Sequence, residues 1–142
     1  MMGIGLLGLV GCAGERPANL GIHEGGLTAC PSSPNCVSSQ ANDQGHHIAP
    51  LSFGGDGDAA FVRLKRVLDL RSDATIIQEQ PGYLQFELRT TLFVDDAEFL
   101  LDREKRIIHI RSASRLGYSD LGKNRSRLEE IRREFQQAGQ TP

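Results

Sequence analysis

Basic side chains gather in one part of the sequence, where they could bind an anion. From Arg103 to Arg133 there are ten Lys or Arg and four Asp or Glu, a local charge of +6. The rest of the chain has six basic and fourteen acidic residues, a charge of −8. Such asymmetry indicates either an anionic partner or two regions that pack together and neutralise each other, and the second interpretation is the simpler one.

Arginines on two predicted strands, and on the loop and helix that follow them, have the right chemistry for an anion site. Guanidinium groups bind carboxylates and phosphates with pairs of charge-assisted hydrogen bonds. Basic residues in the first turns of a helix are unfavourable unless an anion or acidic side chains lie there. We therefore predict a site for a small anionic ligand formed by Arg89, Arg111, Arg115, Asn124 and Arg125, with Asp95, Asp96 and Asp120 in support.

Two other interpretations of the same charges stay open. Asp95 and Asp96 can reach Arg111, Arg115 or Arg125, which would make the cluster an internal ion-pair network with no ligand. Alternatively, the polar face of the sheet could present these side chains to another protein of the cell envelope. An exposed apolar patch near that face would support this third interpretation.

Catalytic signals in the sequence are weak. His109 is the only histidine in a predicted strand, and with an acidic neighbour it could form the acid–base pair of an enzyme of unassigned reaction. The sequence has no Gly-x-Ser-x-Gly and no Ser-x-x-Lys motif. The four histidines are scattered, so neither a metal nor a cofactor is expected. A binding or structural role is favoured over catalysis.

Two helices and four strands must position these residues. Apolar side chains recur at helical spacing after a cap at Asp56 or Asp58, and again from Lys123 to Gln137. Alternation predicts strands over residues 74–79, 83–91, 93–101 and 106–112. The expected fold class is α+β, a two-layer sandwich in which an antiparallel sheet of four to five strands has both helices on one face. The other face would carry Glu87, Arg89, Glu98, His109 and Arg111, in contact with water.

The first residues have the character of an export signal. The segment from Gly3 to Gly11 is apolar and too short to span a membrane, and it resembles a signal-peptide core. The four residues that end at Cys12 resemble a bacterial lipobox, which implies cleavage before Cys12 and a lipid on its side chain. We then expect a tether over residues 12–26, one domain over residues 27–137 and a tail over residues 138–142. The expected location is the bacterial envelope, with the protein anchored in a membrane and facing the periplasm or the exterior, where nucleic acid is not a partner.

Cys30 and Cys36 are expected to form a structural disulfide. Exported proteins fold in oxidising compartments, and Pro31 and Pro34 favour a tight loop between the two cysteines. Zinc sites and redox-active pairs usually have Cys-x-x-Cys spacing, whereas five residues separate this pair.

Three segments are unusual as a set. They read CPSSPNCVSSQ over residues 30–40, LRTTLFVDDAEF over residues 88–99 and IRSASRLGYSDLGKNRSR over residues 110–127. Together they resemble the DUF1499 family of proteins of unknown function, over about residues 27–137. The resemblance implies an exported or lipoprotein-like bacterial chain. It implies no activity, substrate or cofactor.

Overall fold

Four long strands form an antiparallel meander, because each alternates its side chains between two faces and is joined to the next by a short turn. The computed structural model describes residues 14–117 and 122–140. The meander consists of β5 (Ala74–Gln80), β6 (Tyr83–Arg89), β7 (Val94–Asp102) and β8 (Ile107–Ser114). Each strand agrees with its prediction to within two residues at either end.

Shorter strands extend the sheet beyond β8. Strands β3 (Cys36–Ser38) and β4 (Leu51–Ser52) both pair with β8, and the main order is β3-β8-β7-β6-β5. A separate two-stranded ribbon is formed by β1 (Ile22–His23) and β2 (Gly26–Leu27). Strands of two or three residues are too short to show a period, so the sequence did not predict them.

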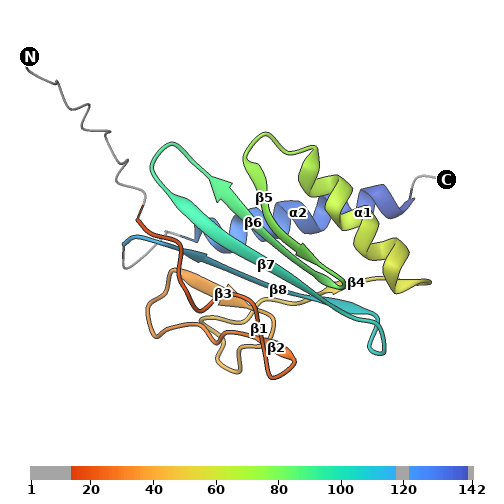
Figure 1. Ribbon diagram of the computed structural model, residues 1–142, viewed down its shortest axis with the longest axis horizontal. Coiled ribbons are helices and arrows are strands. Elements are labelled where there is room, and N and C mark those ends of the chain that lie inside the picture. The colour runs from red at the N-terminus through yellow and green to blue at the C-terminus, as the bar shows by residue number, and fades with distance from the viewer. Residues whose placement is uncertain (1–13, 118–121, 141–142) are drawn as a thin grey trace, which may run out of the picture.

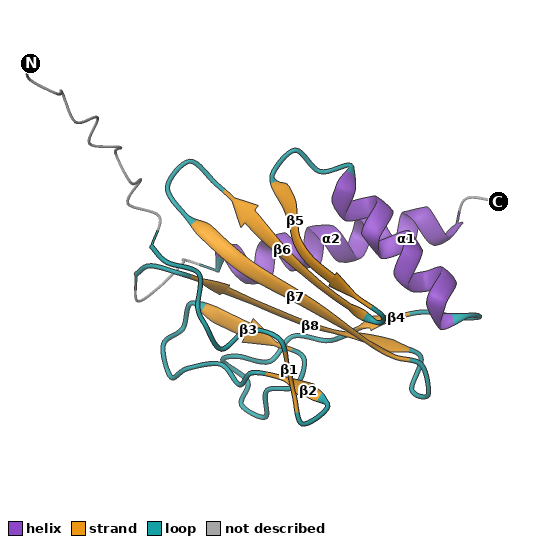
Figure 2. Ribbon diagram, in the orientation of Figure 1, coloured by secondary structure: helices purple, strands orange, loops and turns teal. Residues whose placement is uncertain are grey.

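Both helices lie on the same face of the sheet (Figures 1 and 2). Helix α1 (Gly57–Asp69) begins after Asp56, whose carboxylate accepts a hydrogen bond from the backbone N–H of Ala59. Helix α2 (Lys123–Gln140) continues three residues beyond its predicted end, into the expected tail. The two-layer α+β sandwich is therefore confirmed. Of the helices described here, none combines the length and apolar character needed to cross a membrane.

The hydrophobic core lies between the helices and the sheet. Phe86 and Phe99 point to it from adjacent strands, and both are fully buried. Apolar stripes cover them from the two helices: Leu64 and Leu68 in α1, Leu128, Ile131 and Phe135 in α2. The apolar side chains that alternate with polar ones in β6, β7 and β8 therefore face the helices.

The N-terminal segment, which we define as residues 14–34, lies against the opposite face of the sheet (Figure 1). Arg16 forms an ion pair with Glu87, and the backbone N–H of Gly21 donates to Glu98 at 2.8 Å. Residues 14–26 thus differ from the free tether that the sequence suggested. Hydrogen bonds to buried carboxylates hold them on the domain.

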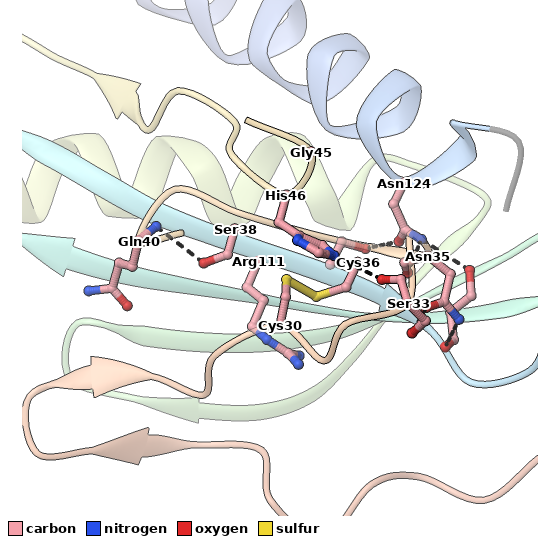
Figure 3. The surroundings of a disulfide bond; sticks show 12 residues. Cys30, Ser33, Asn35, Cys36, Ser38, Gln40, Gly45, His46, Arg111 and Asn124 are labelled. Atoms are coloured by element: carbon pink, nitrogen blue, oxygen red, sulfur yellow. Dashed lines mark hydrogen bonds between the residues drawn. A yellow bond between two sulfur atoms is a disulfide. The ribbon is translucent and has the colours of Figure 1, made fainter. Parts of the chain in front are cut away.

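The predicted disulfide between Cys30 and Cys36 is present, with 5.7 Å between the two Cα atoms (Figure 3). Cys36 belongs to β3, which pairs with β8, while Cys30 belongs to the N-terminal segment. The disulfide therefore ties the N-terminal segment to the sheet.

Replacing both cysteines, Cys30→Ala with Cys36→Ala, is expected to lower the free energy of unfolding by about 2 kcal/mol, because the open loop gives the unfolded chain more freedom. Urea unfolding of the oxidised wild type and the double variant measures the difference. Reductant should destabilise the wild type and leave the variant unchanged. Equal stability of the oxidised wild type and the variant would contradict the expectation.

Candidate functional site

The polar face of the sheet is formed by side chains that face away from the helices. Glu87 pairs in register with Asp96 across β6 and β7, and Glu98 pairs with Arg111 across β7 and β8. The predicted placement of Glu87, Glu98 and Arg111 on this face is correct. The expected contact with water is wrong, because all three are nearly inaccessible beneath the N-terminal segment. The sequence did not reveal this cover, since residues 14–34 carry no periodic pattern.

Arg115 joins two of these carboxylates. Its Nε and Nη2 atoms donate to the two oxygens of Asp96 at 2.9 and 2.8 Å, and Nη2 also donates to Glu87 at 2.6 Å. The hydrogen bonds that Arg115 donates, first to Asp96 and then to Glu87, raise its pKa above the usual range. The Asp96–Arg115 pair shows that part of the charge cluster is the internal network that the sequence offered as an alternative.

Glu87 is the carboxylate with the most cationic partners. Burial disfavours its charged form, but hydrogen bonds from Arg16, Arg115 and Arg89 outweigh this effect and lower its pKa from 4.5 to about 2. Arg89 donates to it from the exposed end of β6 at 3.0 Å. Glu87 therefore stays ionised and connects the N-terminal segment to the sheet.

Glu98 has neutral donors on one oxygen and a cation beside the other. The hydroxyl of Tyr83 donates to Oε1 at 2.7 Å, together with the backbone N–H of Gly21 at 2.8 Å. Burial, followed by the bond to Glu98, raises the pKa of Tyr83, so its hydroxyl keeps its proton. Arg111 Nη1 lies 3.5 Å from Oε2, which is too long for a strong hydrogen bond.

Arg111 is a buried cation of this face with one unused donor. Its side chain is 5% exposed, and its Nε atom has no hydrogen-bond partner within the described part of the chain. Burial lowers its pKa, although the nearby carboxylate of Glu98 opposes that effect. Figure 3 shows the side chain of Arg111 beside Cys30 of the disulfide. A buried donor without an acceptor is costly, so this atom requires an explanation.

A cavity adjoins this guanidinium. It has a volume of about 430 Å³ and lies between the N-terminal segment and the polar face. Part of its lining is charged, and the rest consists mostly of proline and alanine side chains. The lining residues are Pro17, Asn19, Ala29, Pro31, Asp96, Arg111, Ala113, Ser114 and Arg115.

The structure brings only part of the predicted anion site together. Arg111 and Arg115 both line the cavity, and Arg89 is linked to Arg115 through Glu87. Arg125 lies elsewhere, where it donates to the backbone carbonyl of His47 at 2.7 Å. Asn124 lies on the helix side of the sheet. The predicted supporting residue Asp120 and the predicted lipidation site Cys12 lie outside the described residues.

A second buried polar network explains Asn124 and Asp95. Asn124 donates to the backbone carbonyl of Asn35 and to Ser114 Oγ, both at 3.0 Å. Asp95 accepts from Ser114 Oγ at 2.7 Å and from Arg127 Nη1 at 3.1 Å. Asp95 and Asp96 are adjacent in a strand and must point to opposite faces. The alternation of side chains along the strand could therefore have shown that the two aspartates belong to different networks. No sequence pattern indicated that Asn35 and Arg127 take part.

His109, the candidate acid–base residue, lies in a row with a serine and an aspartate. Ser39 Oγ is 3.2 Å from its Nδ1, and Asp102 is 3.8 Å from its Nε2. Burial is the main cause of its lowered pKa. Ser39 Oγ also accepts the backbone N–H of Ile110 at 2.9 Å, so this serine holds the segment after β3 to β8. The Asp102 distance is longer than a hydrogen bond, so the row is better explained by strand pairing than by catalysis.

A larger groove of about 700 Å³ runs between the end of α1 and α2. Its central cation, Arg71, donates to Asp73, Glu130 and Glu134 at 2.7 to 3.1 Å. These acceptors satisfy its guanidinium within the chain. No lining residue of this groove has a buried donor without an acceptor, in contrast to the cavity at Arg111. Among the described residues, no group of three or more His, Cys, Asp or Glu could hold a metal ion.

The network around Glu87 predicts a dependence of stability on pH. Because its pKa falls from 4.5 in the unfolded chain to about 2 in the folded state, Glu87 stabilises the fold fully above about pH 4.5. This contribution is lost as the pH falls from 4.5 towards 2. We expect Glu87→Gln to be less stable than the wild type at pH 7 and to lose less stability on acidification.

Urea midpoints at pH 7 and pH 3 measure this difference. Glu104→Gln, in the exposed turn between β7 and β8, is the matched control and should behave as the wild type does. Parallel pH profiles for the wild type and Glu87→Gln would contradict the assigned role.

Comparison with known proteins identifies the family but adds no activity. The family model described as a protein of unknown function, DUF1499, matches residues 26–135. Neither the curated proteins nor the solved structures yielded a match. The matched residues include the disulfide, the polar face of the sheet and most of α2. Because the match extends over most of the sequence, the chain belongs to the DUF1499 family.

Proposed function

We propose that this protein is a lipid-anchored protein of the bacterial envelope that binds a small organic anion in the cavity beneath its N-terminal segment. The observation that carries the proposal is the buried guanidinium of Arg111, which lines the cavity and has an Nε donor without an acceptor in the described chain. A ligand carboxylate in the cavity would give this guanidinium a charge partner. Binding, rather than catalysis, is proposed because the lining offers no poised nucleophile.

The charges near Arg111 favour a ligand with one negative charge. Asp96 also lines the cavity, and Glu98 lies 3.5 Å from the guanidinium. Both carboxylates would repel a second negative charge on the ligand, and the repulsion is strong in a buried site. Arg115 already has Asp96 and Glu87 as acceptors, so Arg111 is left as the main contact. These features support a monocarboxylate over a phosphate dianion.

The rest of the lining suits an apolar ligand body. Pro17 and Pro31 come from the N-terminal segment, together with Ala29, while Ala113 comes from β8. These side chains have no hydrogen-bonding groups to satisfy. A volume of about 430 Å³ is within the range of small-molecule sites. The Asn19 side chain could add one polar contact that fixes the orientation of the ligand.

The envelope location rests on two features of the chain. The residues before Cys12 resemble a lipobox, so export would end with a lipid on that cysteine. The Cys30–Cys36 disulfide fits an oxidising compartment, since disulfides are rare in the cytosol. An extracytoplasmic binding protein with a membrane anchor agrees with both features.

Replacing Arg111 is expected to weaken binding. Binding of benzoate and of inorganic phosphate to the full chain would be measured by titration calorimetry, with Arg111→Gln and Arg111→Lys as variants. Losing a charge-assisted hydrogen bond in a buried site weakens affinity by about tenfold to a hundredfold. We expect wild type to bind benzoate more tightly than phosphate, and both variants to bind it at least about tenfold more weakly.

The control variant is Arg125→Gln, which removes a predicted ligand residue that the structure places at His47 and away from the cavity. It should bind benzoate as the wild type does. Thermal unfolding without ligand checks that each variant is folded. Equal benzoate affinity for wild type and folded Arg111→Lys would overturn the proposal. Tighter binding of phosphate than of benzoate would overturn the proposed preference for a singly charged ligand.

A further inference from the structure

Two loops at one end of the domain carry exposed apolar residues. The described chain begins at the same end. Leu92, in the turn between β6 and β7, is 75% exposed, and Leu116, just after β8, is 41% exposed. The loops are neighbours, because Asp95 pairs with Ser114 and the backbone N–H of Arg115 donates to the carbonyl of Val94 at 3.1 Å. Large exposed apolar side chains on adjacent loops mark a surface that can meet an apolar partner.

The N-terminal segment begins at this same end. A Cβ atom added to Gly14 would lie 3.0 Å from Leu116 Cδ2, so the backbone of Gly14 lies close to the Leu116 side chain. Gly14 also has a φ of +78°, a conformation that favours glycine. Figure 1 shows the start of the described chain beside the loop after β8 and near the β6–β7 turn. The chain therefore leaves the domain next to Leu116.

The covalent chain then limits how far a lipid on Cys12 can be from this surface. Cys12 is two residues before Gly14, and two residues span at most about 7 Å. If Cys12 carries a lipid, its backbone lies at the membrane interface. The membrane must consequently approach the end of the domain that carries Leu92 and Leu116.

The charged residues at this end fit an interface of that kind. The side chains of Arg16 and Arg89 are 45% and 55% exposed, and both also bond to Glu87 beneath them. Long arginine side chains can cover apolar surface while their guanidinium groups reach polar headgroups. Glu15 is an exposed acid at the same end, so apolar contact is the main attraction, with a smaller electrostatic part.

We infer that Leu92 and Leu116 form a membrane-contacting surface that holds the domain in a fixed orientation on the bilayer. The inference rests on the lipid anchor at Cys12 in the proposed function, and it is independent of the ligand at Arg111. A single lipid anchor with a flexible tether leaves a domain free to rotate. Here, the connection to the lipid is short, and the two leucines insert into the bilayer as a second attachment of the domain.

Tryptophan scanning tests this orientation, because the chain has no native tryptophan. Leu92→Trp, Leu116→Trp and the control Glu104→Trp would be made in the full chain. Glu104 follows the other end of β7, whose nine residues place it about 30 Å from Leu92. Each protein would be purified from host membranes and reconstituted in phosphatidylethanolamine–phosphatidylglycerol vesicles, with and without brominated acyl chains.

Bromine quenches a tryptophan that enters the acyl region. We expect quenching several times stronger at positions 92 and 116 than at position 104. Equal quenching at all three positions would overturn the inference. An emission shift at positions 92 and 116 that depends on protein density and resists bromine would also overturn it, because it would show a second copy of the chain on this surface.

The intact mass of the purified chain separates failure of the anchor from failure of the orientation. A mass without lipid on Cys12 would overturn both the proposed anchoring and this inference. A lipidated mass with equal quenching would overturn the orientation alone. Benzoate binding to the same preparations reports separately on the cavity at Arg111.

Discussion

Burial of three carboxylates on one face of the sheet is the constraint on which the rest of the structure depends. Glu87, Asp96 and Glu98 are all nearly inaccessible to solvent. A buried carboxylate is stable only with cationic or hydrogen-bonding partners, and the sheet alone does not provide enough of them. Arg115 comes from the loop after β8, while Arg16 and Gly21 come from the N-terminal segment. The acids therefore determine where that segment lies.

The position of the N-terminal segment in turn creates the candidate site. It covers the polar face, is fixed at the disulfide, and encloses the cavity beside Arg111. Most donors of the network have acceptors within the chain, whereas Arg111 Nε does not. Glu98 Oε2, 3.5 Å from Arg111 Nη1, also has no hydrogen-bond partner in the described chain, so the network is incomplete where Arg111 lines the cavity, as expected of a binding site. In a purely structural network, the unused Arg111 donor would carry a desolvation cost without compensation.

The sequence was sufficient for the elements with a clear period. Alternation in β6 placed Glu87 on the polar face and Phe86 in the core, and helical spacing located α1 and α2. The charge asymmetry had been interpreted as two regions that neutralise each other. The structure supports this interpretation where Arg115 and Arg127 of the basic region pair with Asp96 and Asp95.

The rest could not be predicted, because it depends on contacts between segments without a period. No periodic pattern in residues 14–34 indicates that they pack on the polar face, where they bond to Glu87 and Glu98 through one arginine and one backbone N–H group. The predicted ligand set therefore combined residues from both faces. Asn124 donates a hydrogen bond to the carbonyl of Asn35 on the helix side of the sheet, and Arg125 donates one to the carbonyl of His47. Sequence proximity in α2 could not separate them from Arg111.

The state of the Arg111 Nε–H group tests the central claim most directly. Its ¹H–¹⁵N NMR signal can be assigned by its loss in Arg111→Lys, and then followed during titration with benzoate. The account predicts a slowly exchanging proton, because the group is buried, and a saturable change in its chemical shift as the carboxylate binds to the guanidinium. A signal that is unaffected by benzoate, or a proton that exchanges as fast as that of an exposed arginine, would contradict the claim.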